Sequence, residues 1–133
     1  MDFFTAMRVS ASGLSAERTR VNLAASNLAN AETTRGPDGG PYRRLDPVFQ
    51  AAPLADGAVG VRVSQVVSDA GAGRRVYSPG HPDADPEGFV ALPNVNPIYE
   101  VVNLVSASRS YEANAAAVET IKQMAQRGLD IAR

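Results

Sequence analysis

The sequence predicts a mainly α-helical chain with a small β-rich insert, in which long N- and C-terminal helices pair as a coiled coil and enclose short strands and loops. The first observation is where the helix-breaking residues lie. All nine prolines fall between Pro37 and Pro97, and nine of the eleven glycines fall between Gly36 and Gly88. Two long segments almost free of these residues therefore flank a middle region full of turn signals. The second observation is a seven-residue apolar repeat in both flanks, which is typical of paired helices.

The N-terminal helix is expected over residues 3–31. Gly13 costs about 1 kcal/mol relative to alanine inside a helix, so we expect the first turns to be held loosely. Stop signals follow at Asn30 and Gly36. The apolar side chains that share one face of this helix are Met7, Leu14, Val21 and Leu28, widened by Ala11, Ala24 and Ala25.

The C-terminal helix is expected over residues 97–131, with a length of about 52 Å at a rise of 1.5 Å per residue. Asn96 is a good N-cap, and Pro97 suits the first helical position. Because the apolar period matches that of the N-terminal helix, the two are predicted to pack together. The apolar face consists of Leu104, Tyr111 and Val118, supported by Val101, Ala107, Ala115, Ile121 and Ala125.

The opposite faces of both helices carry small uncharged side chains instead of the lysine and glutamate common on solvated helices. Such faces permit close packing against further helices, although periodicity alone is equally consistent with a weakly charged solvated surface. Phe3 and Phe4 either cap the helix pair or dock onto a neighbouring molecule. The small polar residues are Ser10, Ser12, Ser15, Asn22, Ser26, Asn27 and Asn30, then Asn103, Ser106, Ser108, Ser110 and Asn114.

The middle of the chain is expected to contain short strands and turns. Strands are expected over 42–49 and 59–67, the second with apolar residues at alternate positions, and shorter extended pieces at 74–77 and 89–92. Residues 37–40 are expected to form a turn. The chain thus divides into an N-terminal helix at 1–35, a β-rich region at 36–93 and a C-terminal helix at 94–133. The pattern leaves open whether the middle is a small domain or a hairpin lying on the helices.

Composition argues against catalysis and against several kinds of ligand. A net charge of −1 gives no basic excess for nucleic acid, and the absence of cysteine excludes disulfides and thiolate sites. His81 is the only histidine, and its neighbours Asp83 and Asp85 favour an exposed turn over a metal site. The glycine-containing run at 71–75 lacks the strand–loop–helix context of a phosphate site. We therefore expect a protein that is not an enzyme and has no metal or other cofactor.

The sequence also carries no expected membrane segment or cleaved signal. No run approaches the eighteen or so apolar residues of a membrane span, so direct membrane insertion is not expected. The N-terminus has an acid, Asp2, and no apolar stretch followed by a cleavage site. Any export is expected to proceed without an ordinary signal peptide.

Four stretches resemble a known family. Residues 12–34, SGLSAERTRVNLAASNLANAETT, resemble the N-terminal signature of bacterial flagellar rod and hook proteins. Residues 94–131, particularly the run ASRSYEAN, are similar to the C-terminal signature of the same axial proteins. GPDGGPYRR at 36–44 and VYSPGHPDADPEGFVALPNVN at 76–96 are similar to the proximal rod members of that family.

The resemblance implies a structural subunit of the bacterial flagellar proximal rod. Such a subunit polymerises through its terminal helices and transmits torque from the rotor to the hook. Its implied partners are itself and other rod subunits in a helical assembly, adjacent basal-body components, and the flagellar type III export apparatus. The implied location is the basal body, in a rod that crosses the periplasm.

Assembly and packing are expected to depend on residues that combine the apolar faces with the two family signatures. The helical-hairpin adaptor or export chaperone, a different rod subunit, and a small hydrolase built on His81 are the alternatives. The expected assembly residues are Met7, Leu14, Val21, Asn27, Leu28, Asn30, Leu104, Arg109, Tyr111, Asn114, Val118 and Ile121.

Overall fold

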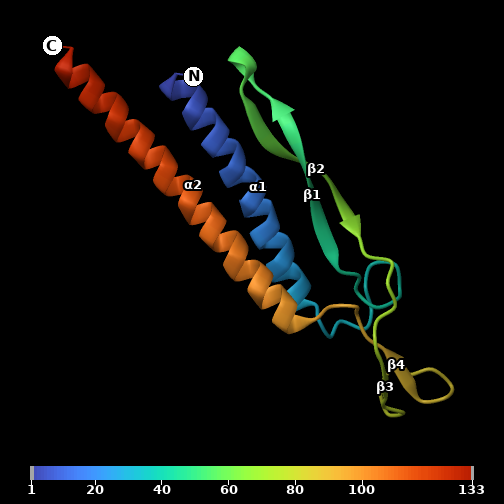
Figure 1. The fold of residues 1–133 in the computed structure, drawn as a ribbon. Coiled ribbons are helices and arrows are strands. Elements are labelled where there is room, and N and C mark those ends of the chain that lie inside the picture. Colours follow the sequence, from blue (N-terminus) through green and yellow to red (C-terminus); the bar gives the residue numbers. More distant parts are fainter. Residues whose placement is uncertain (1, 133) are drawn as a thin grey trace.

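The computed structural model of the chain describes residues 2–132 and contains two long helices with two small antiparallel sheets between them (Figure 1). Helix α1 spans Phe3–Ala29 and helix α2 spans Pro97–Ile131. The first sheet pairs β1 (Leu45–Pro53) with β2 (Val59–Ser68), joined through a short 3-10 helix at Ala55–Gly57. The second pairs β3 (Arg75–Tyr77) with β4 (Phe89–Ala91). Residues 1 and 133, the outermost of the predicted segments 1–35 and 94–133, lie outside the described residues.

Both helices begin where the sequence predicts, because side-chain caps satisfy their first backbone donors. The Asp2 carboxylate accepts a hydrogen bond from the Thr5 amide at 2.7 Å. Asn96 Oδ1 accepts from the amides of Ile98 and Tyr99, and Pro97 occupies the first turn. Helix α1 ends at Ala29, two residues before the predicted end.

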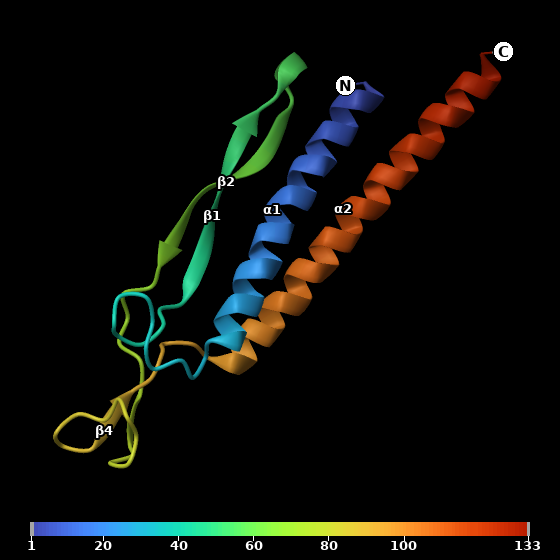
Figure 2. The same cartoon turned by 180° about the vertical axis from the view of Figure 1, so that it is seen from behind.

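The molecule is elongated and has three layers over most of its length. Helix α1 lies between α2 on one side and the β1–β2 hairpin on the other, as opposite views show (Figures 1 and 2). The helices run antiparallel, so the N- and C-termini share one end of the molecule, and the β3–β4 sheet projects beyond the other end. The middle of the chain therefore supplies a hairpin that lies on a helix, together with a separate distal sheet.

Strand β1 starts three residues later than the predicted residue 42. The Tyr42 amide donates to the carbonyl of Thr33, in the turn after α1, and Arg44 pairs with Glu100 at the start of α2. The pairing of β1 with β2 therefore begins only at Leu45. The strand then continues to Pro53. This proline is tolerated because β1 has β2 as its one strand partner. The register shifts after Val48.

The apolar residues buried most deeply on the two helices are small. Ala16, Ala24 and Ala107 are buried, with Ala107 fully inaccessible. A Cβ atom placed on Gly13 would lie 2.9 Å from Asn114 Oδ1. The expectation that Gly13 merely loosens the first turns was therefore incomplete, because the missing side chain lets α2 approach α1 closely.

The helix pair is tight at one end and open at the other. Near the α2 N-terminus the Arg20 guanidinium of α1 donates to Asn103 Oδ1 at 2.8 Å. Toward the termini the two ribbons diverge in both views (Figures 1 and 2). Five residues expected on the apolar faces are exposed instead: Ala11, Ala25, Val101, Tyr111 and Ala115.

Candidate assembly surfaces

A buried ion pair fixes the start of α2 against the chain that precedes β1. Glu100, in the first turn of α2, has no accessible surface and accepts a hydrogen bond from Arg44 Nε. The Arg44 amide donates to Asn94 Oδ1 at 3.2 Å, and its guanidinium lies 5.1 Å from the centre of the Tyr99 ring. Burial lowers the pKa of Arg44, but the hydrogen bond and charge of Glu100 outweigh it and raise the pKa above its ordinary value. Arg44 thus stays charged and holds α2 in place.

A second polar contact fixes the start of the hairpin against the end of α1. The buried Asn27 amide donates to the Leu45 carbonyl at 2.8 Å and accepts from the Leu45 amide at 2.9 Å. Asn27 Oδ1 also accepts from the Tyr42 hydroxyl at 2.9 Å. The Asn27 side chain acts as one more strand partner for Leu45, so it ties β1 to α1. We call this end of the molecule, with Asn27, Arg44 and Glu100, the junction.

The structure brings most of the predicted apolar residues together between α1 and α2. Seven side chains are partly buried there: Met7, Leu14, Val21, Leu28, Leu104, Val118 and Ile121. Tyr111 remains more exposed, and with Val21, Ser108, Arg18 and Glu112 it lines a shallow groove between the helices. We call these partly buried side chains together with Tyr111 the seam.

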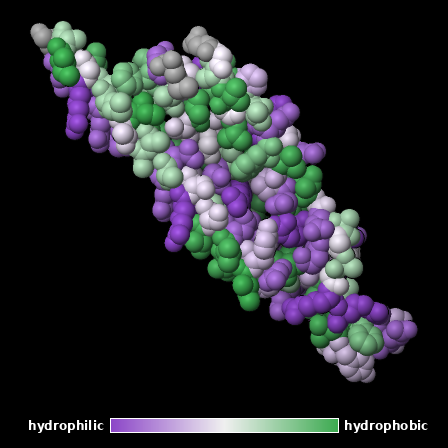
Figure 3. Space-filling model, in the orientation of Figure 1, coloured by the Kyte–Doolittle hydropathy of each residue, from purple (hydrophilic) through white to green (hydrophobic). Residues whose placement is uncertain are grey.

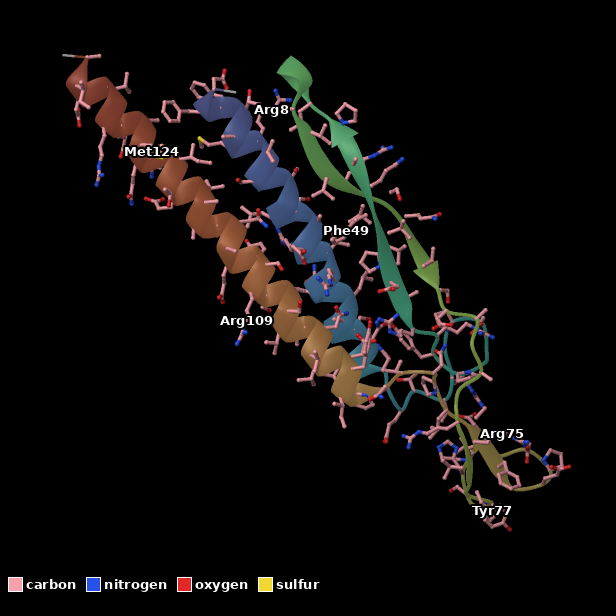
Figure 4. All side chains as sticks on the ribbon, viewed as in Figure 1. Arg8, Phe49, Arg75, Tyr77, Arg109 and Met124 are labelled. Carbon is pink, nitrogen blue, oxygen red and sulfur yellow. The ribbon has the colours of Figure 1, made fainter. Side chains whose placement is uncertain are left out.

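The remaining predicted assembly residues have separate positions. Asn30 caps α1 by donating to the Ser26 carbonyl at 2.8 Å, and Asn27 belongs to the junction. Asn114 lies against Gly13 and donates to the Ser110 carbonyl. Arg109 is exposed and projects from α2 away from α1 (Figure 4).

The small polar residues of α1 divide into two groups. Ser12 Oγ accepts from the Val61 amide at 3.0 Å where Gly60 comes close to the helix, and Ser26 and Asn27 contact Tyr42. Ser12 and Asn27 thus bind the hairpin of their own chain, and Ser26 contacts Tyr42 just before it, which the sequence pattern did not reveal. Ser15 and Asn22 face solvent.

Large apolar side chains remain uncovered on both helices. Of the seventeen exposed large hydrophobic residues among positions 2–132, eleven lie on α1 or α2. Apolar colour gathers over the start of α2 in the space-filling view (Figure 3). The eleven residues are Phe3, Phe4, Ile98, Tyr99, Val101, Val102, Val105, Tyr111, Met124, Leu129 and Ile131. Exposed apolar surface of this extent is typical of an interaction site.

The histidine and aspartates considered for metal binding or catalysis form hydrogen bonds within the chain. The Nδ1 atom of His81 accepts from the Asp83 amide, while the Asp83 carboxylate accepts from Thr34 and Arg35. These hydrogen bonds lower the pKa of Asp83, the Thr34 contribution being the largest. Asp85 accepts from the Phe89 amide and pairs with Arg75, which lies with Tyr77 in the distal sheet (Figure 4). Within residues 2–132 no group of three or more His, Asp or Glu side chains is placed to hold a metal ion.

The helices carry no membrane-spanning signal. In the described part of the chain, neither helix combines the length and the apolar character that crossing a membrane requires.

Comparison with known proteins finds matches at both ends of the chain. Residues 7–37 match the family described as "Flagella basal body rod protein". Residues 87–131 match the family described as "Flagellar basal body rod FlgEFG protein C-terminal". The two matched ranges contain most of α1 and the whole of α2.

Curated relatives match along nearly the entire chain. The flagellar basal-body rod protein FlgC of Yersinia enterocolitica is 45% identical over 125 residues, covering 93% of each chain. The FlgC protein of Salmonella typhimurium is 48% identical over 118 residues, covering 87% of each. The FlgC protein of Bacillus subtilis is 38% identical over 150 residues, covering 100% of each.

Proposed function

The chain belongs to the FlgC family of flagellar basal-body rod proteins, and from this premise we propose how its two helices build the rod. As a member of this family it is a structural subunit of the flagellar basal body and not an enzyme. We propose that it polymerises through α1 and α2 in the proximal rod and transmits torque from the rotor to the hook.

The observation that carries this proposal is that the two helices bury small residues but leave large apolar side chains exposed. The fully buried apolar residues of α1 and α2 are alanines, whereas eleven large apolar side chains of the two helices are exposed. Burying such a side chain contributes about 1.5–3 kcal/mol. Neighbouring subunits would supply that burial, and a contact that does not close into a ring would continue along a filament.

The proposal includes the coiled-coil pairing of the helices and the assembly role of the seam. Tight packing at the junction fixes the relative direction of α1 and α2, and neighbouring subunits would complete the packing toward the termini. Torque would then pass through many aligned helices. The same proposal places the protein among other rod subunits in a rod that crosses the periplasm, after export by the flagellar type III apparatus without a cleaved signal.

Deletion of the gene tests the structural function. We expect non-motile cells whose basal bodies, seen by electron microscopy, retain membrane rings but lack a complete rod and hook. The wild-type gene restores swimming. Motile deletion cells with intact basal bodies would favour the adaptor alternative instead.

Charged substitutions in the seam test the role of the helices. Val21→Asp and Val118→Asp each place a carboxylate in the partly buried seam, so we expect both to prevent rod assembly and swimming. Ala70→Asp is the matched control, because Ala70 is exposed in a loop outside both helices. Normal swimming by both seam variants would contradict the coiled-coil part of the proposal.

A further inference from the structure

The β1–β2 hairpin has two edges, and at its base α1 covers only one of them. Leu45 of β1 turns both of its backbone groups toward Asn27 and therefore away from its strand partner, Ser68. Because facing residues of an antiparallel pair alternate between bonded and unbonded, Ser68 and Val66 point their N–H and C=O groups away from β1. Pro47, opposite Val66, agrees with this pattern because it has no N–H to donate to β2. The base of β2 is thus an open edge.

The tip of the hairpin is better protected. The two strands cross over α1 in both views, so that β2 lies nearer the helix at the tip (Figures 1 and 2). There the Val61 amide of β2 donates to Ser12 Oγ at 3.0 Å. The outer edge of β1 is interrupted by Pro53, which has no N–H, and proline is a common means of keeping an edge strand from pairing. The base of β2, by contrast, has neither proline nor a charged residue over positions 63–68.

The distal sheet also has one covered edge and one open edge. On β4, both backbone groups of Phe89 bond to Asp85, in the turn before the strand. Directly after β3, the Ser78 amide donates to the chain that precedes β4 at 2.8 Å. By the same alternation, Tyr77 and Arg75 point their backbone groups away from β4. Strand β3 is therefore a second open edge.

These two open edges carry most of the exposed apolar side chains outside the helices. Within positions 2–132, six exposed large hydrophobic residues lie outside α1 and α2, and four of the six are on the two edges. Their exposed fractions are 45% for Val66 and 38% for Val67 on β2, and 41% for Val76 and 64% for Tyr77 on β3. Both edges thus combine unpaired backbone groups with apolar side chains, and such an edge is a template for a further strand.

We propose that the open edge of β2 in one copy pairs with the open edge of β3 in a second copy of this chain, which joins the two sheets into one. The inference rests on the proposed assembly function and adds a strand contact to it. Within one copy β2 and β3 run in the same direction, and only residues 69–74 link them (Figures 1 and 2). Parallel strands need a connection of a dozen or more residues to pair with each other. The strand that covers each edge therefore comes from another molecule.

The proposed pairing is parallel and does not close on itself. Copies along a filament keep the same direction, so β2 of one copy and β3 of the next run the same way. The distal sheet lies beyond the helix pair, whereas the base of β2 lies beside α1 (Figures 1 and 2). Pairing the two strands therefore displaces the second copy along the long axis of the first. Pairing β2 with β2, or β3 with β3, would instead form a two-fold dimer and leave nothing to continue the assembly.

The register follows from the spacing of the residues that point outward. In a parallel pair the two backbone groups of one residue bond to the two residues that flank its neighbour. Val66 then fits between Arg75 and Tyr77: its N–H donates to the Arg75 carbonyl, and its carbonyl accepts from the Tyr77 amide. The Ser68 amide donates to the Tyr77 carbonyl. The ladder stops there, because Pro79 has no N–H for the Ser68 carbonyl.

The side chains match in this register. Val66 lies beside Val76, and Val67 lies beside Tyr77, so all four exposed apolar side chains of the two edges gain an apolar neighbour. Pairs of β-branched and aromatic residues on adjacent strands are favourable. The Tyr77 ring already packs against Phe89, with ring centres 5.3 Å apart, so this row of side chains continues across the enlarged sheet. A shift by two residues in either direction would place a polar residue beside Val66.

Disulfide cross-linking tests the pairing, because the chain has no cysteine of its own. Val66→Cys and Val76→Cys are placed in separate copies, one of them with a small tag, and expressed together in cells that lack the native gene. Isolated basal bodies are then oxidised. Adjacent strands lie about 4.8 Å apart, and a disulfide joins Cα atoms about 4.4–6.8 Å apart, so we expect a mixed covalent dimer. The matched control combines Val76→Cys with Val59→Cys, an exposed valine at the tip of β2, and should give no dimer.

A chain that carries both cysteines tests whether the contact repeats. We expect oxidation to produce a ladder of covalent dimers, trimers and longer products, because each copy has one edge of each kind. Any of four results would overturn the inference: no mixed dimer, equal yield from the control pair, a dimer formed by Val66→Cys copies alone, or a doubly substituted chain whose products stop at the dimer.

Swimming of each single-cysteine strain before oxidation shows whether the variant assembles. If either variant of the first pair does not swim, the next pair in the register, Val67→Cys with Tyr77→Cys, is scored by the same criteria. Swimming cells without the mixed dimer would reject this pairing and leave the proposed function standing, whereas motile cells with the gene deleted would reject the function itself.

Proline substitution tests the backbone bonds. Ser68→Pro removes the outward N–H that donates to the Tyr77 carbonyl in the proposed pairing, and it removes no bond to β1. We expect the yield of the mixed dimer to fall at least several-fold, with little change in the free energy of unfolding of the purified chain. Ala51→Pro is the matched control: Ala51 lies opposite Val61, so its N–H points away from β2 at the protected tip, and the yield should stay the same. Equal yields from the two proline variants would contradict the proposed hydrogen bonds.

Discussion

The two ends of the helix pair differ in how they are stabilised. At the junction, buried polar side chains are bonded within the chain: Glu100 to Arg44, and Asn27 to both backbone groups of Leu45. At the opposite end α1 and α2 diverge, and Phe4, Leu129 and other apolar side chains face solvent. The junction specifies the fold of one subunit with its own contacts, whereas the free end has surface that only another molecule can cover. Variants at the two ends should therefore have different consequences.

The largest effect is expected from removing the buried carboxylate of the junction. Glu100→Ala leaves the Arg44 guanidinium in a mostly buried position without its partner, and breaking a buried pair in this way typically costs about 3–5 kcal/mol. The free energy of unfolding of the purified chain, measured by urea titration with circular dichroism, should fall by that amount.

Two further variants separate charge from packing at this position. Glu100→Gln keeps the size and a hydrogen-bond acceptor but removes the charge, so its loss should be smaller than that of Glu100→Ala. Glu112→Ala removes an exposed carboxylate of the same helix and should change stability by no more than about 0.5 kcal/mol. Equal stability of the Glu100→Ala variant and the wild type would show that the junction is not what holds α2.

A smaller effect is expected from the second junction contact. Asn27→Ala leaves the amide and carbonyl of Leu45 without their side-chain partner, at a cost of about 1–3 kcal/mol for buried groups. Hydrogen exchange of the Leu45 amide should become faster along with the loss of stability. Asn22→Ala is the matched control, since Asn22 is exposed on the same helix and should leave both quantities nearly unchanged. An unchanged exchange rate at the Leu45 amide in Asn27→Ala would contradict the role of Asn27 in holding β1 against α1.

The sequence predicted the elements better than their contacts. Helix α2 spans the predicted residues because Asn96 and Pro97 are local signals, and the predicted strands all occur within a few residues of their expected ends. No local pattern indicated that Ser12 and Asn27 bind the hairpin, or that Glu100 is buried. An acid in the first turn of a helix is common in exposed helices, and the partner Arg44 is distant in sequence. The apolar period located the seam, but it did not indicate the exposed apolar residues Ile98, Val102 and Val105 at the start of α2.

The smallest effect is expected at the free end. A side chain on Gly128 would meet no atom within 4 Å, so Gly128→Ala gains helix propensity of at most about 1 kcal/mol without a clash. Because this part of α2 lies far from the junction, we expect slower hydrogen exchange over residues 124–131 and little change in the urea midpoint. Gly13→Ala is the matched comparison: its new Cβ would lie against Asn114, so the same gain in propensity is offset by displacement of that side chain. An equal rise in the free energy of unfolding for both variants would mean that the two ends of the helix pair unfold as one unit. It would contradict the claim that the junction is stabilised by its own contacts while the opposite end is not.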